Sequence, residues 1–269
     1  MAVTWVDGRF QLIEKVEYGS YATVYHAQNI ITNEQVTVKR LQGGSGVPQS
    51  IWFGREGPYH AMVLKCLGPS LSDFNQSCGT FGLQSVSELG IHLIYLLKFI
   101  HTHNVIHHNI KPQNMLMGLG DFKDTTFIID FGVATEYCDA STRIHVTMHE
   151  NRSLIGTPTF TSINSHMRLD LSRCDDIEAL AYTLIFMLCS SLPWLTFDGQ
   201  SPLHSIILEC KKDLLAGVHD IPPIFAAIVT HAHSLSFLDK PNYDYLCSIL
   251  EGCTHMVELH HHQLAKTNK

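Results

Sequence analysis

The sequence lacks the features that mark several specialised classes of protein. Its eight cysteines include no Cys-x-x-Cys pair, and no signal peptide precedes them, so we interpret them as reduced thiols of a cytoplasmic or nuclear protein. The longest apolar run, residues 179–189, is shorter than the roughly 20 residues that cross a bilayer. Lys and Arg number 18 against 25 Asp and Glu, a net charge of -7. We therefore expect no membrane and no nucleic-acid partner.

The composition predicts a folded protein. The 269 residues are 45% hydrophobic and 16% charged, enough to bury the core of one two-lobed domain or two small ones. The 18 histidines are unusual, and either His260–His262 or His231 with His233 could hold a metal. We favour a solvated tail and a loop, because no Cys or carboxylate stands at ligand spacing to them.

Residues 8–65 read as antiparallel strands, because short β-rich runs alternate with turn residues. The predicted strands are Phe10–Val16, Thr23–Gln28, Gln35–Arg40, Ile51–Phe53 and His60–Leu64. A break at Leu67–Ser70 then marks a lobe boundary. After it the period becomes helical, with helices predicted at Ser85–His103, Asp175–Cys189, Leu203–Leu215, Pro223–His233 and Tyr243–Cys253.

Two stretches carry the chemistry. The first is Val105–Asn114, and the second is a short apolar strand that ends in Asp130-Phe131-Gly132. A lysine and an amide at fixed spacing, followed by an acidic residue at a strand end, are typical of a floor for phosphate and magnesium. These stretches resemble the protein-kinase signatures His-Arg-Asp-x-Lys-x-x-Asn and Asp-Phe-Gly. The pattern fits at His107, Lys111 and Asn114 but has His108 and Asn109 in place of Arg and Asp.

Further phrases resemble the casein kinase 1 family, including Ser-Ile-Asn in place of Ala-Pro-Glu. They are Leu67–Leu71, Lys111–Gly118, Ile129–Gly132, Ser162–His166 and Asp239–Tyr243. The resemblance implies an α+β, bilobal protein kinase-like fold with a β-rich small lobe and a mostly helical large lobe. It also implies ATP with Mg²⁺ and phosphorylation of protein Ser and Thr. One domain is expected at 9–255, with a small lobe at 9–66, a large lobe at 67–255 and a His-rich tail at 256–269.

The resemblance assigns a nucleotide site. Lys39 would pair the α- and β-phosphates, although a surface lysine on a strand has the same sequence appearance. Gly19 would lie over the phosphates, Lys65 and Leu67 in the hinge that holds adenine, and Val24 and Leu116 on the two faces of the base. Asn114 and Asp130 would hold the metal, and Lys111 would neutralise the γ-phosphate. Catalytic positions are thus Asn109, Lys111, Lys39 and Asp130.

Three departures from the family indicate a damaged catalytic centre. Asn109 stands where a carboxylate accepts the substrate proton, and a neutral amide cannot act as a base. Of the glycine-rich loop only Gly19 remains. Residues 43–48 resemble the segment that follows the small lobe's regulatory helix, so this helix and its Glu are missing, unless an exon was mispredicted. There are two smaller departures. Thr37 replaces the alanine that lies against the adenine. Thr159 and residues 196–200 replace an arginine and a basic stretch of the family.

For Asp176 and Thr157 we expect specific contacts with the catalytic loop. Asp176 should anchor the backbone of the catalytic loop from the central helix, and Thr157 should bond Asn109 and Lys111. From Asn109, the missing helix and the eroded glycine loop we expect a pseudokinase that binds ATP weakly and acts as a monomer on a protein partner, for example an active relative. The alternatives are a weakly active Ser/Thr kinase with a protein substrate, supported by intact Lys39 and Asp130, and a drifting gene copy without a role.

Overall fold

The structure is a computed structural model of the whole chain. It describes residues 5–18, 22–41, 51–56, 59–139, 142, 144–150, 152–195, 203–215 and 221–252. At some strand positions, Lys39 among them, only the backbone is described. The predictions for Gly19, residues 43–48, residues 196–200 and the His-rich tail lie outside the described residues. The chain divides into two units, residues 1–68 with 116–132 and residues 69–115 with 133–269.

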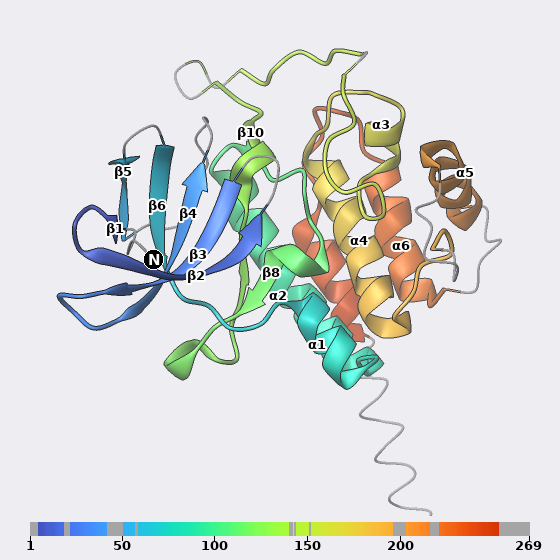
Figure 1. Cartoon of the computed structure of the whole chain (residues 1–269). Coiled ribbons are helices and arrows are strands. Elements are labelled where there is room, and N and C mark those ends of the chain that lie inside the picture. The colour runs from blue at the N-terminus through green and yellow to red at the C-terminus, as the bar shows by residue number, and fades with distance from the viewer. Residues whose placement is uncertain are drawn as a thin grey trace, which may run out of the picture. The chain divides into compact units, whose positions relative to one another are not determined.

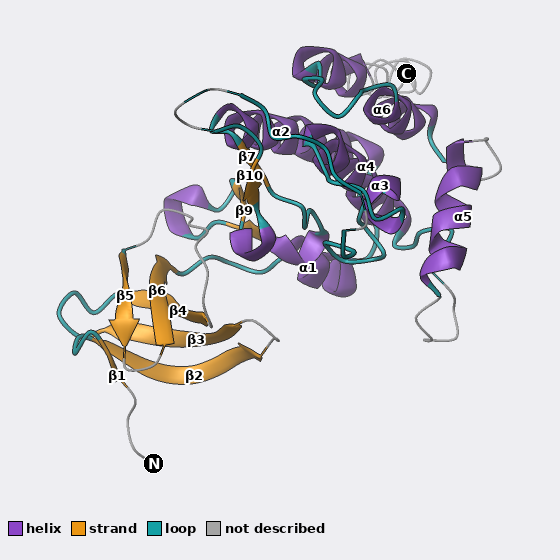
Figure 2. Cartoon of the chain, turned by 90° about the horizontal axis from the view of Figure 1, so that it is seen from above, coloured by secondary structure: helices purple, strands orange, loops and turns teal. Residues whose placement is uncertain are grey.

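The first unit is built on an antiparallel sheet of six strands in the order β1-β2-β3-β4-β6-β5 (Figures 1 and 2). The strands are β1 (Trp5–Val6), β2 (Phe10–Tyr18), β3 (Ala22–Asn29), β4 (Gln35–Leu41), β5 (Trp52–Glu56) and β6 (Tyr59–Lys65). Alternate residues such as Val36, Val38, Ala61 and Val63 are buried in one cluster with Phe10. The alternation places one face of the sheet on this core. The predicted strands are confirmed, and β1 was missed.

A second pair of strands belongs mostly to the first unit. β8 (Met115–Met117) and β9 (Thr126–Ile128) form a two-stranded sheet. The segment directly after β6 contacts this pair: the Gly68 N–H donates to the Met117 carbonyl oxygen over 2.7 Å. Gly118 is required between the two strands, since a Cβ there would collide with the backbone of Phe122. The predicted strand before Asp130 is confirmed, although it ends at Ile128.

Helices dominate the second unit. They are α1 (Leu71–Cys78), α2 (Leu83–Thr102), α3 (Ile163–His166), α4 (Arg173–Cys189), α5 (His204–Leu215) and α6 (Pro223–His233), with a further helix at 243–252. α4 lies in the centre and packs against both α2 and α6 (Figure 1). The carboxylate of Asp175 accepts a 2.6 Å hydrogen bond from the Ser172 N–H, which closes its first turn. From Arg173 to Ile185 every residue is buried, so the predicted core helix is confirmed.

α2 shows the amphipathic pattern that predicted it. Leu93, Leu97 and Ile100 are buried on one face, and Gly90 lets the helix approach Leu184 and Leu250 closely. By length and composition α2 is also the one described helix that could cross a membrane, but its buried residues pack as those of a core helix do. The predicted α+β class is confirmed. α1 and α3 were missed, and both begin at a serine whose hydroxyl caps the helix.

Candidate functional site: the loop of residues 107–114

The 107–114 loop is held between short regular elements. β7 (Val105–Ile106) precedes it and pairs antiparallel with β10 (Thr135–Glu136), and a single 3-10 turn, Pro112–Asn114, closes it. His108 adopts a φ of 67°, a left-handed conformation that is unusual for a non-glycine residue. A backbone of this kind persists where the surroundings fix it, and the hydrogen bonds of the loop show what fixes it.

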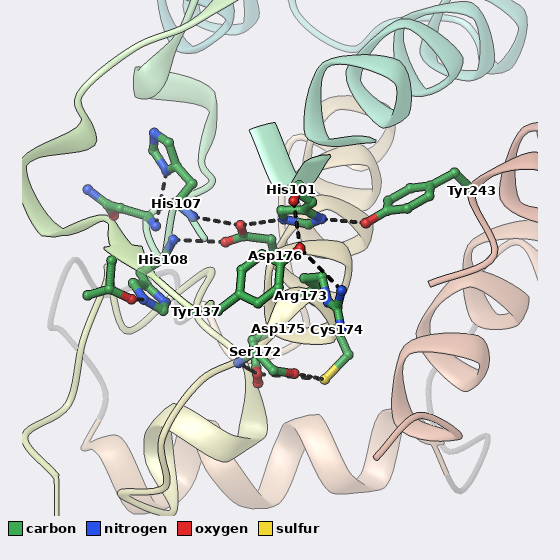
Figure 3. Close-up of polar contacts among 12 residues, drawn as sticks. His101, His107, His108, Tyr137, Ser172, Arg173, Cys174, Asp175, Asp176 and Tyr243 are labelled. Carbon is green, nitrogen blue, oxygen red and sulfur yellow. Dashed lines mark hydrogen bonds and ion pairs between the residues drawn. The ribbon is translucent and has the colours of Figure 1, made fainter. Parts of the chain in front are cut away.

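Asp176, from the first turn of α4, anchors the start of the loop. Its carboxylate accepts the backbone N–H groups of His107 and His108, both over 2.8 Å (Figure 3). Its Oδ2 also accepts from Nε2 of His101 over 3.0 Å. Burial alone would raise the pKa of Asp176, but the His101 hydrogen bond and the nearby imidazoles outweigh it and lower this pKa to about 2. The predicted anchoring role of Asp176 is confirmed.

His101 connects this anchor to distant parts of the chain (Figure 3). Its Nε2 donates to Asp176, because a carboxylate only accepts. In the neutral ring Nδ1 accepts from the hydroxyl of Tyr243, 2.7 Å away. The backbone oxygen of His101 accepts from the Tyr137 hydroxyl over 2.6 Å, and Arg173 donates to that hydroxyl over 3.2 Å. All of these side chains are buried, so the network fixes α2, α4 and the loop together.

Asn109 lies at the centre of a second set of contacts. Its Oδ1 accepts the hydroxyl of Thr157 over 3.0 Å, and its backbone N–H donates to Nδ1 of His107 over 3.2 Å. The Nδ2 group of Asn114 donates to the Asn109 backbone oxygen over 2.8 Å. The predicted Thr157–Asn109 bond is therefore confirmed, and the structure brings Asn109, Asn114 and Thr157 together. Lys111 is half-buried and directly precedes the 3-10 turn.

His108 is buried in place of the arginine of the signature. Its Nε2 lies 2.6 Å from the Thr135 hydroxyl in β10. Burial lowers the pKa of His108, although the Asp176 carboxylate opposes this. The side chain is therefore a neutral imidazole at pH 7, and it holds β10 beside the loop without the positive charge that an arginine would bring.

The remaining predicted positions belong to the first unit. Val24 of β3 lies directly opposite Lys39 of β4 in the sheet, and Val24, Leu67 and Leu116 are half-buried whereas Lys65 is exposed. Thr37 also lies on β4, where its hydroxyl is 3.6 Å from the Cys66 sulfur. Asp130 has a φ of 69° and directly precedes the 3-10 turn Phe131–Val133. These positions stay predictions as binding residues.

The donor chemistry of the proposed metal ligands suits magnesium, which prefers oxygen. The Nδ2 of Asn114 is used within the loop, so the atom this side chain can offer a metal is its carbonyl oxygen. Asp130 would contribute a carboxylate. Among the described residues there is no group of three or more His, Cys, Asp and Glu side chains that could hold a metal. His231 instead accepts from the Asn242 N–H, and His233 pairs with Glu178 at 3.0 Å.

Sequence reasoning missed His101, Tyr137 and Arg173 as supports of the loop. Tyr243 was noticed only as part of a family-type phrase. No local pattern marks these residues, because the two partners of His101 lie 75 and 142 positions away in the sequence. A histidine near the end of an apolar helix was the one available signal, and it equally fits ordinary core packing.

Residues 51–240 match the family described as protein kinase domain. The match covers more than half of the chain and includes both the 107–114 loop and Asp130.

Proposed function

Since this chain belongs to the protein kinase domain family, whose members in general use ATP and Mg²⁺, we propose that it is a casein kinase 1-like domain with strongly impaired phosphotransfer. It acts by binding a protein partner, for example an active relative. We place this binding protein in the cytoplasm or nucleus, as a monomer. Subfamily, partner and location rest on the sequence phrases and composition given above.

Asn109 carries this proposal. In the signature, its position is that of the carboxylate that orients the substrate hydroxyl and accepts its proton. Asn109 is a neutral amide whose Oδ1 already accepts the Thr157 hydroxyl. The amide can orient a hydroxyl but holds no site for a proton. General base catalysis contributes about 10²–10⁴ in rate, and this is the loss we assign to Asn109.

The other residues of the loop support a retained binding function rather than a loss of all function. Asp176 holds the backbone of His107 and His108, and Asn114 closes the loop onto Asn109. The domain therefore keeps an ordered large-lobe surface beside a weakened centre.

The retained residues fit ATP with magnesium. Asn114 and Asp130 offer oxygen ligands, and Lys111 offers a charge for the γ-phosphate. Bound Mg²⁺ neutralises charge on the phosphates. Because phosphoryl transfer relies mainly on positioning and charge, these residues favour a second candidate, a weakly active Ser/Thr kinase with a protein substrate.

Transfer of labelled γ-phosphate from ATP with Mg²⁺ to an acidic protein distinguishes the two. We expect the wild type to match a Lys39→Met control. An Asn109→Asp variant should gain about 10²-fold or more, the rate contribution of a general base, and an Asn109→Asp, Lys39→Met double variant should lose it again. Ordinary transfer by the wild type that Lys39→Met abolishes would refute the proposal. No gain in Asn109→Asp would refute the claim that Asn109 limits transfer.

ATP binding needs its own measurement. A ligand that binds only the folded state raises the unfolding temperature, so ATP with Mg²⁺ should raise it for the wild type. The rise should be smaller for Lys39→Met. A wild type without any rise would leave the proposed partner binding intact but remove ATP from it.

A further inference from the structure

The segment that carries Thr157 rests on a buried lysine. Lys211, from α5, is fully buried with 0% of its surface exposed. Its ammonium nitrogen donates to the Pro158 oxygen over 3.0 Å and to the Thr161 oxygen. It also lies 3.3 Å from Nε2 of His166. Two of its N–H donors thus meet backbone oxygens, and Nε2 of His166 lies within hydrogen-bond distance of both the ammonium nitrogen and the Pro158 oxygen, 3.1 Å away.

Aromatic rings complete the enclosure of this ammonium group. It lies 4.9 Å from the centre of the Tyr182 ring and 5.1 Å from that of Trp194, within the range of cation–π attraction. The Nε1 group of Trp194 donates to the Thr159 oxygen over 2.9 Å. Buried side chains therefore hold three backbone oxygens of the short stretch 158–161, which directly follows Thr157.

We propose that Lys211 is a positioning residue that fixes the 157–161 turn, and through it the contact of Thr157 with Asn109. An isolated buried ammonium is costly unless it is hydrogen-bonded, and an apolar side chain would fill the same cage without that cost. The oxygens that hydrogen-bond this ammonium group belong to the backbone of one turn, whereas the Glu178 carboxylate favours the charge without a hydrogen bond to it. The buried charge therefore serves the geometry of that turn. This inference holds whether or not the protein transfers phosphate.

Amide hydrogen exchange of the full chain, followed by mass spectrometry, tests the proposal. Lys211→Met fills the cage but removes the donors, and should speed exchange in peptides covering 155–168 on the order of tenfold for each charged hydrogen bond lost. Peptides of α2 should be unaffected. Lys212→Met is the matched control, because Lys212 is exposed and pairs with Glu209. Trp194→Phe, which keeps a ring but loses the N–H, should give a smaller local effect.

The side-chain amide of Asn109 gives a second, independent reading. In a protein labelled with ¹⁵N-asparagine, its signal is identified by its loss in Asn109→Ser. Lys211→Met should shift this signal and Lys212→Met should not, because Lys211 binds the turn that follows Thr157 whereas Lys212 pairs with Glu209 at the surface. Equal acceleration of exchange in all peptides would show a purely structural role and overturn the proposal. An unchanged Asn109 signal in Lys211→Met would overturn it as well.

The pH profile is a third reading. Burial lowers the pKa of Lys211 to about 7, although Glu178 opposes this. Titratable groups around it are His166 of α3 and Glu178 and Tyr182 of α4, with His204 beside His166 and His233 beside Glu178. The unfolded chain binds this proton more strongly, so wild-type stability should rise with pH above 7. This rise in stability should be absent in Lys211→Met and present in Lys212→Met. A rise retained in Lys211→Met would contradict the proposal that Lys211 is buried as a charged group.

Discussion

Two adjacent aspartates of α4 should respond in opposite ways to the same substitution. Asp175 and Asp176 are both buried, at 4% and 1% exposure, and Figure 3 shows their carboxylates turned to different partners. Asp176 faces N–H groups of the 107–114 loop and His101, whereas Asp175 faces Ser172 and Asn164. We predict that Asp176→Asn destabilises the protein at pH 7 and that Asp175→Asn does not.

The magnitude for Asp176 follows from its three hydrogen bonds. An amide keeps only one oxygen, so the side chain introduced by Asp176→Asn could accept from His107 and His101 but would turn its NH₂ toward the His108 N–H. A buried donor without a partner costs about 1–3 kcal/mol. The pKa gives a matching figure, because the difference between 3.8 and about 2 corresponds to about 2 kcal/mol in favour of the charged form. Both figures describe the same loss in the free energy of unfolding, which we place at about 2–3 kcal/mol.

At Asp175, unlike Asp176, the effect of burial on the pKa outweighs that of the hydrogen bonds. Burial raises its pKa to about 6 despite hydrogen bonds from Ser162, Ser172 and Asn164. The difference from 3.8 corresponds to about 3 kcal/mol against the charged form at pH 7. Asp175→Asn removes that charge, but its NH₂ would face one of the donors that the carboxylate accepts, a loss of about 1–3 kcal/mol that the gain of about 3 kcal/mol offsets. The variant should therefore be as stable as the wild type or more stable.

The two groups also give opposite pH dependences. The folded-state pKa of Asp176 lies below its unfolded value, so its contribution is present above pH 3.8 and is lost as the pH falls toward 2. The folded-state pKa of Asp175 lies above its unfolded value, so stability falls as the pH rises from about 4 to 6. Asp175→Asn should abolish this fall, while Asp176→Asn should leave it in place.

Urea denaturation followed by far-ultraviolet circular dichroism measures both variants, with the free energy of unfolding extrapolated to water at pH 5 and pH 7. The reasoning would be refuted if Asp176→Asn were as stable as the wild type, because the loop would then not depend on the charge. It would also be refuted if Asp175→Asn lost as much stability as Asp176→Asn, since burial alone, rather than the partners, would then decide the effect.

Two further substitutions test how helices of the second unit are held. Ser70→Ala removes the hydroxyl that accepts the Asp73 N–H over 3.2 Å at the start of α1, and should cost about 1 kcal/mol by thermal unfolding; an unchanged unfolding temperature would mean that the cap contributes nothing. Gly90→Ala would bring its Cβ to 2.8 Å from Leu250 and 3.0 Å from Leu184. Crowding of about 1–3 kcal/mol should then exceed the gain of about 1 kcal/mol in helix propensity, and a stabilised variant would show that α2 can move.

Much of the fold followed from periodicity. The strands of the sheet alternate buried with less buried residues, as at Val36, Thr37 and Val38, and Leu93 and Leu97 recur at helical spacing. Elements with weak patterns were missed. α1 and α3 have eight and four residues, so their apolar periods are too short to read, although Ser70 with Asp73 was a legible cap. Strand β1 has only two residues, which no periodic pattern can mark.

The sequence by itself determined which chemical groups the candidate site holds. The sequence alone shows that Asn109 stands at the position of a carboxylate, and no arrangement of the chain can turn its amide into a base. The kinase-like order of Lys111, Asn114 and Asp130 was equally legible, since these residues are close in sequence or follow a recognisable strand.

Only the tertiary structure decided what holds these groups in place. Asp176 and His101 lie 75 residues apart, and Lys211 lies about 50 residues from the carbonyls it binds. A buried carboxylate and a buried lysine look like surface charges in a sequence. Their roles arise when folding removes water and leaves specific N–H groups and carbonyl oxygens as the available partners. Burial also sets opposite pKa directions for Asp175 and Asp176, which as neighbours in one sequence would have been given the same role.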